Sequence, residues 1–275
     1  MLLEEKYELL KDIIREKGSA AVAFSAGVDS TFLIKVVKDV LGDKIIAVTA
    51  TSSTYPEREL KEAIEYAKNI GVKHIIINSE ELDIKGFANN PKNRCYYCKT
   101  ELYTRIKKVA EENGVEYIFD GANLDDTGDF RPGMQAAKEQ GVISPLKEAQ
   151  LAKKDIRKLS KEMGLPTWNK PSFACLSSRF PYGNKITIKK LSMVDKAEQF
   201  LLDLGIREVR VRHHENIARI EVDPEEREKL FNIDLLDKIG NKLKEIGFAY
   251  VTFDVLGYRT GSMNEVLTEE DKEIK

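Results

Sequence analysis

The chain of 275 residues is long for one hydrophobic core, so its length predicts two domains of modest size. Hydrophobic residues make up 42% and charged residues 33%, which is typical of soluble globular proteins, and no apolar run is long enough to span a membrane. The formal net charge of −2 argues against strong nucleic-acid binding, which needs a basic surface. The N-terminus lacks a basic-then-apolar targeting signal, so we expect a cytoplasmic protein.

Short apolar runs alternate with helical runs through the first half of the chain. A first helix is expected where leucine and isoleucine recur on one face, over 4–17. The strands expected after it are 20–24, 44–50, 73–78 and 116–120. The other helices expected in this half are 31–41, 56–70, 95–113 and 152–163. Glycines stand where three of these helices end, at Gly42, Gly71 and Gly114. The alternation predicts an α/β fold, with a parallel sheet covered by helices on both faces and ligands at the carboxyl ends of the strands.

The pattern changes after the last of these helices. Residues 164–184 contain three prolines, two glycines and the only tryptophan, which predicts a long irregular loop of a functional or linking kind. A helix, two strands, a helix and a strand are expected next, over 188–204, 208–212, 217–222, 234–246 and 249–254. The chain is therefore predicted to comprise a first domain that carries the cysteines, 1–185, a smaller α+β domain, 186–260, and a frayed polar tail, 261–275.

The most informative motif is Phe24-Ser25-Ala26-Gly27-Val28-Asp29-Ser30-Thr31, between the first expected strand and the helix that follows it. A turn of small residues lets backbone N–H groups close on an anion at the positive end of a helix, and Ser25, Ser30 and Thr31 can add hydroxyl donors. A Walker loop would need a Gly-Lys-Ser/Thr ending, and a dinucleotide fingerprint would need two more glycines. The alternative is an ordinary strand-to-helix turn with Asp29 as the helix N-cap.

The three cysteines are an odd number and a poor framework for disulfides. Cys95 and Cys98 open an expected helix, where thiolates three positions apart fall on one side and the helix dipole lowers their pKa. Cys175 lies far downstream in the irregular loop. A zinc site would want a fourth ligand, and His213 and His214 have no suitable spacing. A [4Fe–4S] cluster with one iron free of protein ligand fits three cysteines, while zinc, a thioredoxin-like redox pair and three unrelated buried thiols remain alternatives.

A polar segment follows the strand expected at 116–120. It reads Gly121-Ala122-Asn123-Leu124-Asp125-Asp126, at the edge of the sheet where the phosphate-binding turn also lies. Its Asn and Asp side chains can hold a magnesium ion or orient a nucleotide, or the segment is simply a polar turn. Arg131 extends the same loop and can meet phosphate, or pair with Asp129.

The segment 171–183 has a composition that a structural loop does not require. It places the thiol of Cys175, the hydroxyls of Ser177 and Ser178 and the guanidinium of Arg179 within five residues. These groups favour a chemical role for the loop.

Two arginines alternate along the first strand expected in the second domain. Arg210 and Arg212 therefore share one face of that strand. Two parallel guanidinium groups suit a phosphate or a carboxylate. The alternative is a solvated strand face paired with acids such as Glu221.

Together these motifs resemble the LarE-type ATP-dependent sulfur transferases of the PP-loop ATP pyrophosphatase superfamily, which act in synthesis of the nickel-pincer nucleotide cofactor. The turn at 25–30 is similar to the PP-loop pattern Ser-Gly-Gly-x-Asp-Ser, with Ala26 in place of the first glycine. The resemblance covers nearly the whole chain, and its most specific part is Ala174-Cys175-Leu176-Ser177-Ser178-Arg179 with Pro181-Tyr182-Gly183. It also includes 121–126, Arg131-Pro132-Gly133, Leu165-Pro166-Thr167-Trp168 and 210–221.

The resemblance implies a reaction and a set of site residues. ATP would adenylate a carboxylate of pyridinium-3,5-dicarboxylate mononucleotide with release of pyrophosphate, and sulfur would then displace AMP to leave a thiocarboxylate. The residues implied for ATP and Mg²⁺ are Ser25, Gly27, Val28, Asp29, Ser30, Gly121, Asn123 and Asp125. Those implied for the acceptor or its phosphate are Arg210, Arg212 and Glu221. Those implied for catalysis are Asp29, Cys175, Ser177 and Arg179.

The resemblance also bears on the source of the sulfur. Family members with only a cysteine matching Cys175 give up its sulfur and end as dehydroalanine, whereas members with an additional C-x-x-C resemble cluster enzymes. This chain resembles the second group, with Cys95, Cys98 and Cys175 as ligands of a [4Fe–4S] cluster that takes an external sulfide at its open iron. The sulfur donor does not follow from the sequence, and the resemblance implies a homo-oligomer.

Three other functions compete with this interpretation. A tRNA thiolation enzyme of the same superfamily also joins three cysteines to a cluster, but the slightly acidic charge and the lack of an obvious RNA-binding module argue against it. A nucleotide-binding iron–sulfur redox sensor would not need the loop at 175–179. An amidating ligase similar to NAD synthetase would not need three cysteines. We therefore expect a small-molecule nucleotide substrate, with neither nucleic acid nor membrane as a partner.

Overall fold

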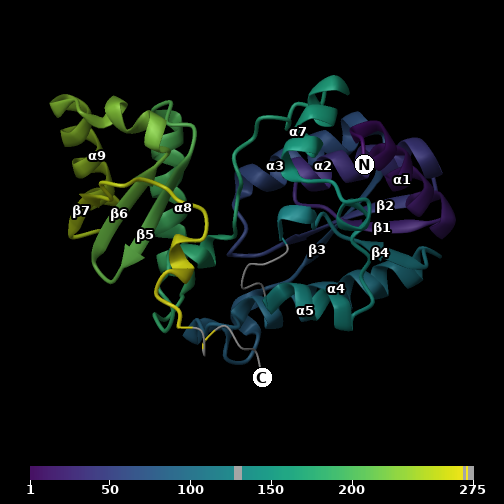
Figure 1. Ribbon diagram of the computed structural model, residues 1–275. Coiled ribbons are helices and arrows are strands. Elements are labelled where there is room, and N and C mark those ends of the chain that lie inside the picture. Colours follow the sequence, from purple (N-terminus) through teal and green to yellow (C-terminus); the bar gives the residue numbers. More distant parts are fainter. Residues whose placement is uncertain (127–131, 269–270, 272–275) are drawn as a thin grey trace. The chain divides into compact units, whose positions relative to one another are not determined.

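The computed structural model describes residues 1–126, 132–268 and 271, and the chain divides into two compact units (Figure 1). The first unit comprises Met1–Glu80 and Asn93–Phe173, and the second comprises Glu81–Lys92 and Ala174–Lys275. Within the described residues, no helix combines the length and the apolar character needed to cross a membrane.

The first unit is built on a four-stranded parallel sheet with the strand order β3-β2-β1-β4. The strands are β1 (Ala20–Ala23), β2 (Ile45–Thr51), β3 (Lys73–Asn78) and β4 (Tyr117–Phe119). In the middle of the sheet, Ala20 lies beside Ile45 on one side and Tyr117 on the other. Because the strands are parallel, the segments after β1 and β4 leave the sheet at the same edge.

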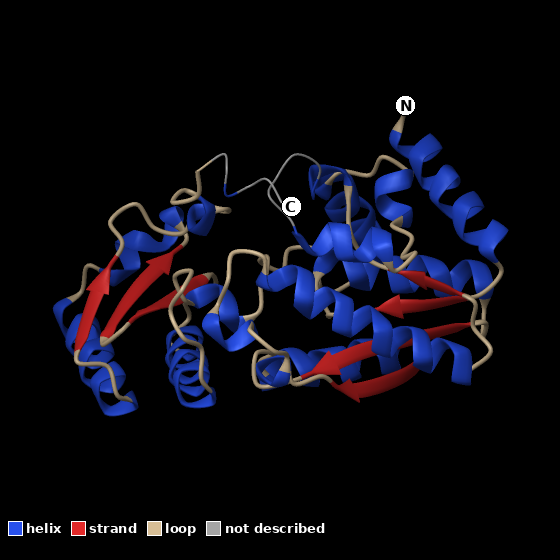
Figure 2. Cartoon of the chain, turned by 90° about the horizontal axis from the view of Figure 1, so that it is seen from below, coloured by secondary structure: helices blue, strands red, loops and turns tan. Residues whose placement is uncertain are grey.

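Helices cover both faces of this sheet (Figures 1 and 2). One face carries α1 (Leu3–Lys17), α2 (Val28–Leu41), α3 (Glu57–Ile70), α6 (Pro145–Glu148) and α7 (Lys153–Glu162). The other carries α4 (Arg94–Glu112) and α5 (Pro132–Glu139). Alternation along β1 sends Ala20 and Val22 into the first core and Ala21 into the second. The expected α/β fold with both faces covered is confirmed.

Glycines end three of the helices as expected, whereas α2 begins earlier than expected. Gly42, Gly71 and Gly114 have φ angles of 62°, 75° and 66°, so these glycines end helices as expected. α2 begins at Val28, three residues before the expected start at 31, because Gly27 is the last residue in an extended conformation. The short helices α5 and α6 were not expected, since four to eight residues give too little periodicity to detect.

The second unit contains a three-stranded sheet with the order β5-β6-β7. Its elements are α8 (Ile188–Asp203), β5 (Val209–His214), β6 (Ile217–Val222), α9 (Ile233–Ile246) and β7 (Tyr250–Phe253). β5 and β6 are antiparallel, whereas α9 connects β6 to a parallel β7. Val211 and Ile220, which pair across the sheet, and Leu201 and Leu243 of the two helices are buried in its core. The expected smaller α+β unit is therefore present.

The boundary between the units falls earlier than the expected position after residue 185. Residues 174–185 belong to the second unit, and so does the detached segment 81–92. Backbone hydrogen bonds explain this assignment, because Gly183 N donates to Asn90 O (2.9 Å) and Ile186 N donates to Ala88 O (2.8 Å). Pairing between segments so distant in the chain leaves no local signal in the sequence.

The expectation of a frayed tail from residue 261 is wrong for its described part, 261–268. A short 3₁₀ turn, Ser262–Asn264, lies in this part. Tyr182 Oη donates to Asn264 Oδ1 (3.1 Å), and Leu267 is 7% exposed. One buried leucine and a side-chain hydrogen bond hold this stretch against the second unit, despite its polar composition.

Candidate functional site

The phosphate turn, which we define as residues 24–27, leads from β1 into α2. No side chain in the described part of the chain caps α2, so the amide groups of its first turn are available to an anion. The N-cap is Gly27, and Asp29 lies in the first turn, so the alternative with Asp29 as the N-cap is wrong. Ala26 has a φ of 56°, in the left-handed region that glycine adopts without strain. An alanine therefore adopts, in this turn, a backbone conformation that favours glycine.

The carbonyl oxygens of the phosphate turn are all engaged by donors of the first unit. The pairs are Phe24 O with Thr49 Oγ1 (2.8 Å), Ser25 O with Tyr55 Oη (3.1 Å), Ala26 O with Lys170 Nζ (3.1 Å) and Gly27 O with Thr31 N (3.0 Å). A backbone turn with its carbonyls held in this way presents N–H groups and not lone pairs to a ligand. The geometry is that of an anion-binding turn.

Two serines and a glycine complete this end of the first unit. Ser25 Oγ and Ser30 Oγ lie 3.1 Å apart, so both hydroxyls flank the turn as expected. Gly121 follows β4, and a Cβ atom placed on it would lie 3.2 Å from Ser30 N and 3.4 Å from Asp29 Cβ. The fold therefore brings 121 against the start of α2, and glycine is needed there for the close approach.

Asp29, in the first turn of α2, has one carboxylate oxygen paired and the other buried. Its Oδ2 pairs with Lys153 Nζ at the start of α7, whereas its Oδ1 is buried and accepts no hydrogen bond from the described residues. Burial raises the pKa of Asp29 above its ordinary value, and the charge of Lys153 offsets only part of that rise. A shielded carboxylate oxygen with a vacant lone pair fits a metal ion such as Mg²⁺.

The polar segment after β4 forms a turn that satisfies many of its own groups. Asn123 is buried, and its Oδ1 accepts from Asp125 N (2.9 Å). Asp125 Oδ2 accepts from Lys153 N (2.8 Å), the first amide of α7, so this carboxylate stabilises a helix start. Asp129 and Arg131 lie outside the described residues. In the described ranges, no group of three or more His, Cys, Asp or Glu side chains is arranged to hold a metal.

Lys153, Lys170 and Tyr55 were missed by the sequence analysis. Their partners in the turn and in α2 lie 124, 144 and 30 residues away in the chain. No motif contains them, and only the folded sheet brings them to the turn. The one local signal was the place of Lys153 at the start of the expected helix 152–163, and it is weak.

Cys95 and Cys98 lie in the first two turns of α4, which begins one residue earlier than expected. Cys95 is exposed, Cys98 is half-buried, and neither forms a disulfide. Lys99 follows them, and its pKa is raised chiefly by the Tyr103 hydroxyl, with smaller contributions from Cys98 and Asp120. This helix start is accessible and electrostatically suited to thiolates.

The Cys175 loop, which we define as residues 174–179, belongs to the second unit. Cys175 is exposed and begins a 3₁₀ turn. Arg179 is fully buried, with Nε and Nη2 donating to the two carboxylate oxygens of Glu198 (2.8 and 2.9 Å). Its Nη1 donates to Ala174 O (2.8 Å) and to Ser178 Oγ (2.8 Å). Arg179 therefore contacts and orients the loop that presents the thiol.

The two serines of this loop differ in exposure. Ser177 is fully buried, and its Oγ has no hydrogen-bond partner among the described residues. Ser178 is half-buried, and its Oγ donates to Cys175 O (2.8 Å). The 3₁₀ turn points the first hydroxyl inward, so Ser178 and not Ser177 offers an accessible hydroxyl beside Cys175.

Arg210 and Arg212 lie on one face of β5, as expected, but both are buried and not solvated. Arg212 donates from Nε and Nη2 to Glu221 Oε2 (2.9 and 2.7 Å) and from Nη1 to Ser178 O (2.8 Å). Arg210 lies over the ring of Tyr258, 4.5 Å from its centroid. Burial lowers the pKa of Arg210, and the charge of Arg179 lowers it further. The face is thus a buried arginine cluster that also supports the Cys175 loop.

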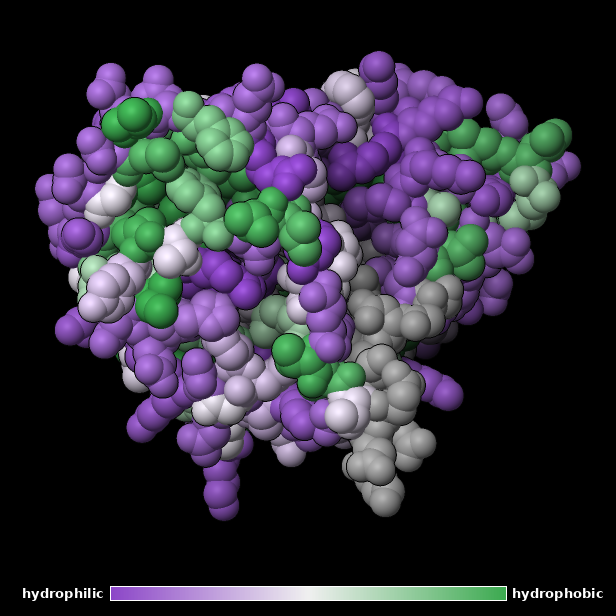
Figure 3. Space-filling view, turned by 60° about the vertical axis from the view of Figure 1, so that its left-hand side comes forward, coloured by the Kyte–Doolittle hydropathy of each residue, from purple (hydrophilic) through white to green (hydrophobic). Residues whose placement is uncertain are grey.

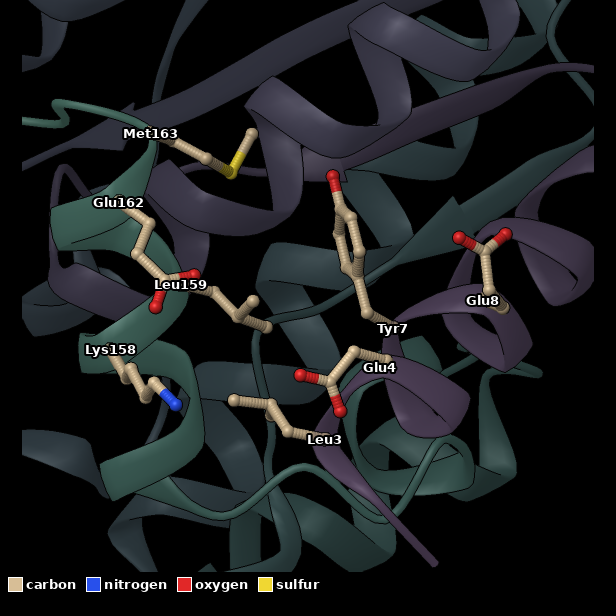
Figure 4. Close-up of a pocket in the computed structure, with 8 residues that line it drawn as sticks. All are labelled: Leu3, Glu4, Tyr7, Glu8, Lys158, Leu159, Glu162 and Met163. Carbon is tan, nitrogen blue, oxygen red and sulfur yellow. The ribbon is translucent and has the colours of Figure 1, made fainter.

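A pocket between α1 and α7 contains none of these residues (Figure 4). Its lining residues are Leu3, Glu4, Tyr7, Glu8, Lys158, Leu159, Glu162 and Met163. The mixed lining has no nucleophile and no converging set of donors, so we do not place the functional site there.

Comparison with known proteins agrees with this geometry. A family model described as NAD synthase matches residues 2–113, which include the phosphate turn. The chain is 40% identical to the pyridinium-3,5-bisthiocarboxylic acid mononucleotide synthase of Lactiplantibacillus plantarum, over 94% of this chain and 92% of that protein. It belongs to the LarE-type family of the PP-loop superfamily. The chain is also 44% identical to an uncharacterized protein of Synechocystis, over 98% of this chain and the full length of that protein. The resemblance drawn from the motifs is confirmed.

Proposed function

We propose that this protein is an ATP-dependent sulfur transferase acting on pyridinium-3,5-dicarboxylate mononucleotide. ATP adenylates a carboxylate of that acceptor, pyrophosphate leaves, and sulfur displaces AMP to give a thiocarboxylate. The observation that carries the proposal is the 40% identity, over 94% of the chain, to a synthase named for a bisthiocarboxylic acid product. Adenylation is needed because a carboxylate is a poor electrophile, whereas AMP is a good leaving group.

The phosphate turn is assigned to the phosphates of ATP. Amide groups of Gly27, Val28 and Ser30 face an anion there because the carbonyls are held elsewhere, and the Ser25 hydroxyl adds a donor. The buried Oδ1 of Asp29 is the group best suited to Mg²⁺, which supplies charge neutralisation for the departing pyrophosphate. Gly121 keeps the space beside Ser30 N clear, and Asn123 and Asp125 fix the adjoining turn.

The function is tested by measuring pyrophosphate release from ATP with and without the acceptor mononucleotide. We expect release that depends on the acceptor, together with a thiocarboxylate product when a sulfur source is supplied. A nucleotide-binding redox sensor would bind ATP without releasing pyrophosphate. A tRNA thiolation enzyme would release it only with tRNA, and either result would exclude the proposal.

The acceptor's phosphate or carboxylate is assigned to the arginine cluster of the second unit. Arg212 and Arg219 share one carboxylate, since Arg219 Nη2 donates to Glu221 Oε1 (2.7 Å). One guanidinium can therefore turn to an anion while Glu221 keeps the other. Loss of a charge-assisted pair costs about 1.5–3 kcal/mol, so the double variant Arg210→Ala, Arg212→Ala is expected to raise the acceptor KM about 10-fold to 100-fold.

The control for this variant is Arg259→Ala, which removes a half-buried arginine of the same unit. ATP affinity is expected to stay unchanged in both proteins. A double variant that stays folded and keeps its acceptor KM would remove the cluster from the proposal.

Cys95, Cys98 and Cys175 are proposed as the thiolate ligands of a [4Fe–4S] cluster. None of the three forms a disulfide, and Cys95 and Cys175 are exposed, which fits ligands that take up iron from solution. Such a cluster would supply an iron site able to bind external sulfide. Ser178 and Arg179 then shape the loop that presents Cys175, and Ser177 stays within the core.

Iron content and absorption of protein purified without oxygen test this assignment independently of turnover. Each Cys→Ala variant is expected to lose iron, whereas Lys185→Ala, at an exposed position of the same unit as Cys175, retains it. Loss of about 34 Da at Cys175 after a single turnover, as a cysteine becomes dehydroalanine, would instead show that the cysteine gives up its own sulfur. Repeated turnover with added sulfide and an intact Cys175 supports the cluster.

We also propose that the protein is a homo-oligomer. Hydrophobic residues form patches among hydrophilic residues on the face shown in Figure 3. The large hydrophobic side chains that are exposed in the second unit include Phe231, Ile233, Tyr250, Val255, Leu256 and Val266. Exposed apolar groups in such number favour an interface. Light scattering of Phe231→Glu, Ile233→Glu should show a smaller species, whereas Leu2→Glu in the first unit should not.

A further inference from the structure

Lys170 stands behind the phosphate turn with every proton of its ammonium group in use. Nζ donates to Ala26 O (3.1 Å), to Glu59 Oε2 (2.7 Å) and to Glu62 Oε2. An ammonium group has three protons, and these are three acceptors. No donor is left for a ligand, so Lys170 serves the turn and not the nucleotide.

The anchors of Lys170 are themselves fixed. Glu59 is 4% exposed, and the side chain of Lys170 is 14% exposed, so the ion pair is shielded from solvent and holds its geometry. Arg157 of α7 donates from Nη1 to Trp168 O (2.8 Å) and from Nη2 to Lys170 O (2.9 Å). Both the backbone and the ammonium group of Lys170 are therefore held in place.

The peptide plane between Ala26 and Gly27 carries the carbonyl that Lys170 binds. A flip of this plane rotates ψ of Ala26 and φ of Gly27 and leaves the φ of Ala26 unchanged, and Gly27 adopts either sign of φ without strain. A flipped peptide would point the Ala26 carbonyl oxygen toward the anion and withdraw the Gly27 N–H from it. A cation fixed on that oxygen opposes the flip.

We propose that Lys170 is a positioning residue that keeps the phosphate turn in its anion-binding conformation. The inference rests on the proposed binding of ATP at this turn. It assigns to a lysine 144 residues from Ala26 the role of holding a peptide plane that the freedom of Gly27 would otherwise let rotate. The substrate groups that depend on it are the phosphates and not the adenosine.

The test is calorimetric binding of three probes, ATP, inorganic pyrophosphate and adenosine, to the full-length protein. Lys170→Met keeps the length of the side chain and removes its charge. We expect affinity for ATP and for pyrophosphate to fall about tenfold or more, and adenosine affinity to change less than about twofold. Lys170→Arg should restore part of the loss, because it keeps a cation behind Ala26.

Lys161→Met is the matched control, because Lys161 lies over the ring of Trp168, 4.7 Å from its centroid, in the same part of the first unit. It should leave all three affinities within about twofold. Equal losses for adenosine and pyrophosphate in Lys170→Met, or no loss for either, would overturn the proposal. A wild-type protein that binds neither ATP nor pyrophosphate would instead overturn the proposed function.

Glu62→Gln carries the test if Lys170→Met does not fold, since the Glu62 side chain is 39% exposed and its loss is mild. Lys170 then keeps its charge but loses one anchor. We expect pyrophosphate affinity to fall about threefold with adenosine affinity unchanged. An unchanged affinity for pyrophosphate in this variant would also contradict the proposal.

Discussion

The phosphate turn and the Cys175 loop use the same device for different ends. In both, a cation donates hydrogen bonds to backbone carbonyls, from 144 residues away in the turn and from within the loop itself at Arg179. Lys170 binds Ala26 O in the turn, and Arg179 binds Ala174 O in the loop. The turn is left with amide groups to offer, whereas the loop is left with an exposed thiol. Backbone presentation suits an anion, and side-chain presentation suits sulfur chemistry.

The two cations differ in burial, and this decides what their loss should do. The Lys170 side chain is 14% exposed, whereas that of Arg179 is not exposed at all. Burial disfavours the charge of Glu198, but Arg179 outweighs it and holds the pKa of Glu198 below its ordinary value. Loss of the Lys170 contacts should lower ligand affinity, whereas loss of the Arg179 contacts should unfold the second unit.

The largest effect is expected at Asp29, in the first turn of α2 beside the phosphate turn. Asp29→Ala removes the carboxylate suited to Mg²⁺, so pyrophosphate release should fall at least about 100-fold while the protein stays folded. Asp39→Ala is the control, because Asp39 lies on the same helix and pairs with Lys35 at the surface. Normal pyrophosphate release by Asp29→Ala would show that the turn's carboxylate is dispensable.

Loss of the ion pair between Arg179 and Glu198 should destabilise the second unit. Glu198→Ala leaves Arg179 buried without its carboxylate, which costs about 3–5 kcal/mol in the free energy of unfolding. The exposed Asp203 at the end of α8 gives the control, since Asp203→Ala should change stability by less than about 0.5 kcal/mol. Chemical denaturation followed by fluorescence measures both, and similar stabilities would refute the structural role.

A methyl group at the edge of the sheet should affect the turn alone. Gly121→Ala would bring a Cβ to 3.2 Å from Ser30 N, so ATP affinity should fall about tenfold. Gly240→Ala in α9 meets no atom within 4 Å and should leave ATP affinity unchanged and stabilise the helix by about 0.5–1 kcal/mol. Wild-type ATP affinity in Gly121→Ala would mean that the segment after β4 does not border the ligand.

A pH experiment separates the effect of the buried Asp29 carboxylate on stability from its proposed role in the reaction. Because burial raises the pKa of Asp29, its protonated form is favoured by folding; that stability is fully present below the ordinary value of 3.8 and lost as pH rises through the raised pKa. Asp29→Asn should therefore raise Tm at pH 7.5, and its advantage should shrink as the pH is lowered toward 4. An advantage that is constant with pH would point to a different cause.

The smallest effect is expected at Ala26. Replacing it by glycine relieves a left-handed conformation by about 1–2 kcal/mol. The gain is offset by about 0.4–1 kcal/mol of unfolded-chain entropy and about 0.8 kcal/mol for one buried methyl group. Ala26→Gly should thus leave stability within about 1 kcal/mol, whereas Ala23→Gly in β1, without a positive φ, should lose about 1 kcal/mol. A large loss in Ala26→Gly would mean that the alanine is needed for packing.

The contrast between the phosphate turn and the Cys175 loop also explains which features the sequence could predict. The phosphate turn is local, since small residues, a preceding strand and a following helix suffice to predict its anion site. The sheet followed from alternation, and the arginine face from the period of a strand. The pairing of Arg179 with Glu198 and the place of Lys170 depend on contacts 19 and 144 residues away in the chain. Such contacts have no periodicity or motif to reveal them.

The detached segment 81–92 has a consequence for how the chain is made. Asn90 Nδ2 donates to Phe180 O, 90 residues further along. A ribosome must therefore produce all of the first unit before this segment meets Phe180, Gly183 and Ile186. Residues 81–92 should wait for these partners while the parallel sheet assembles, and the second unit should be the last to form. A fragment ending at 173 would carry the segment without these three partners.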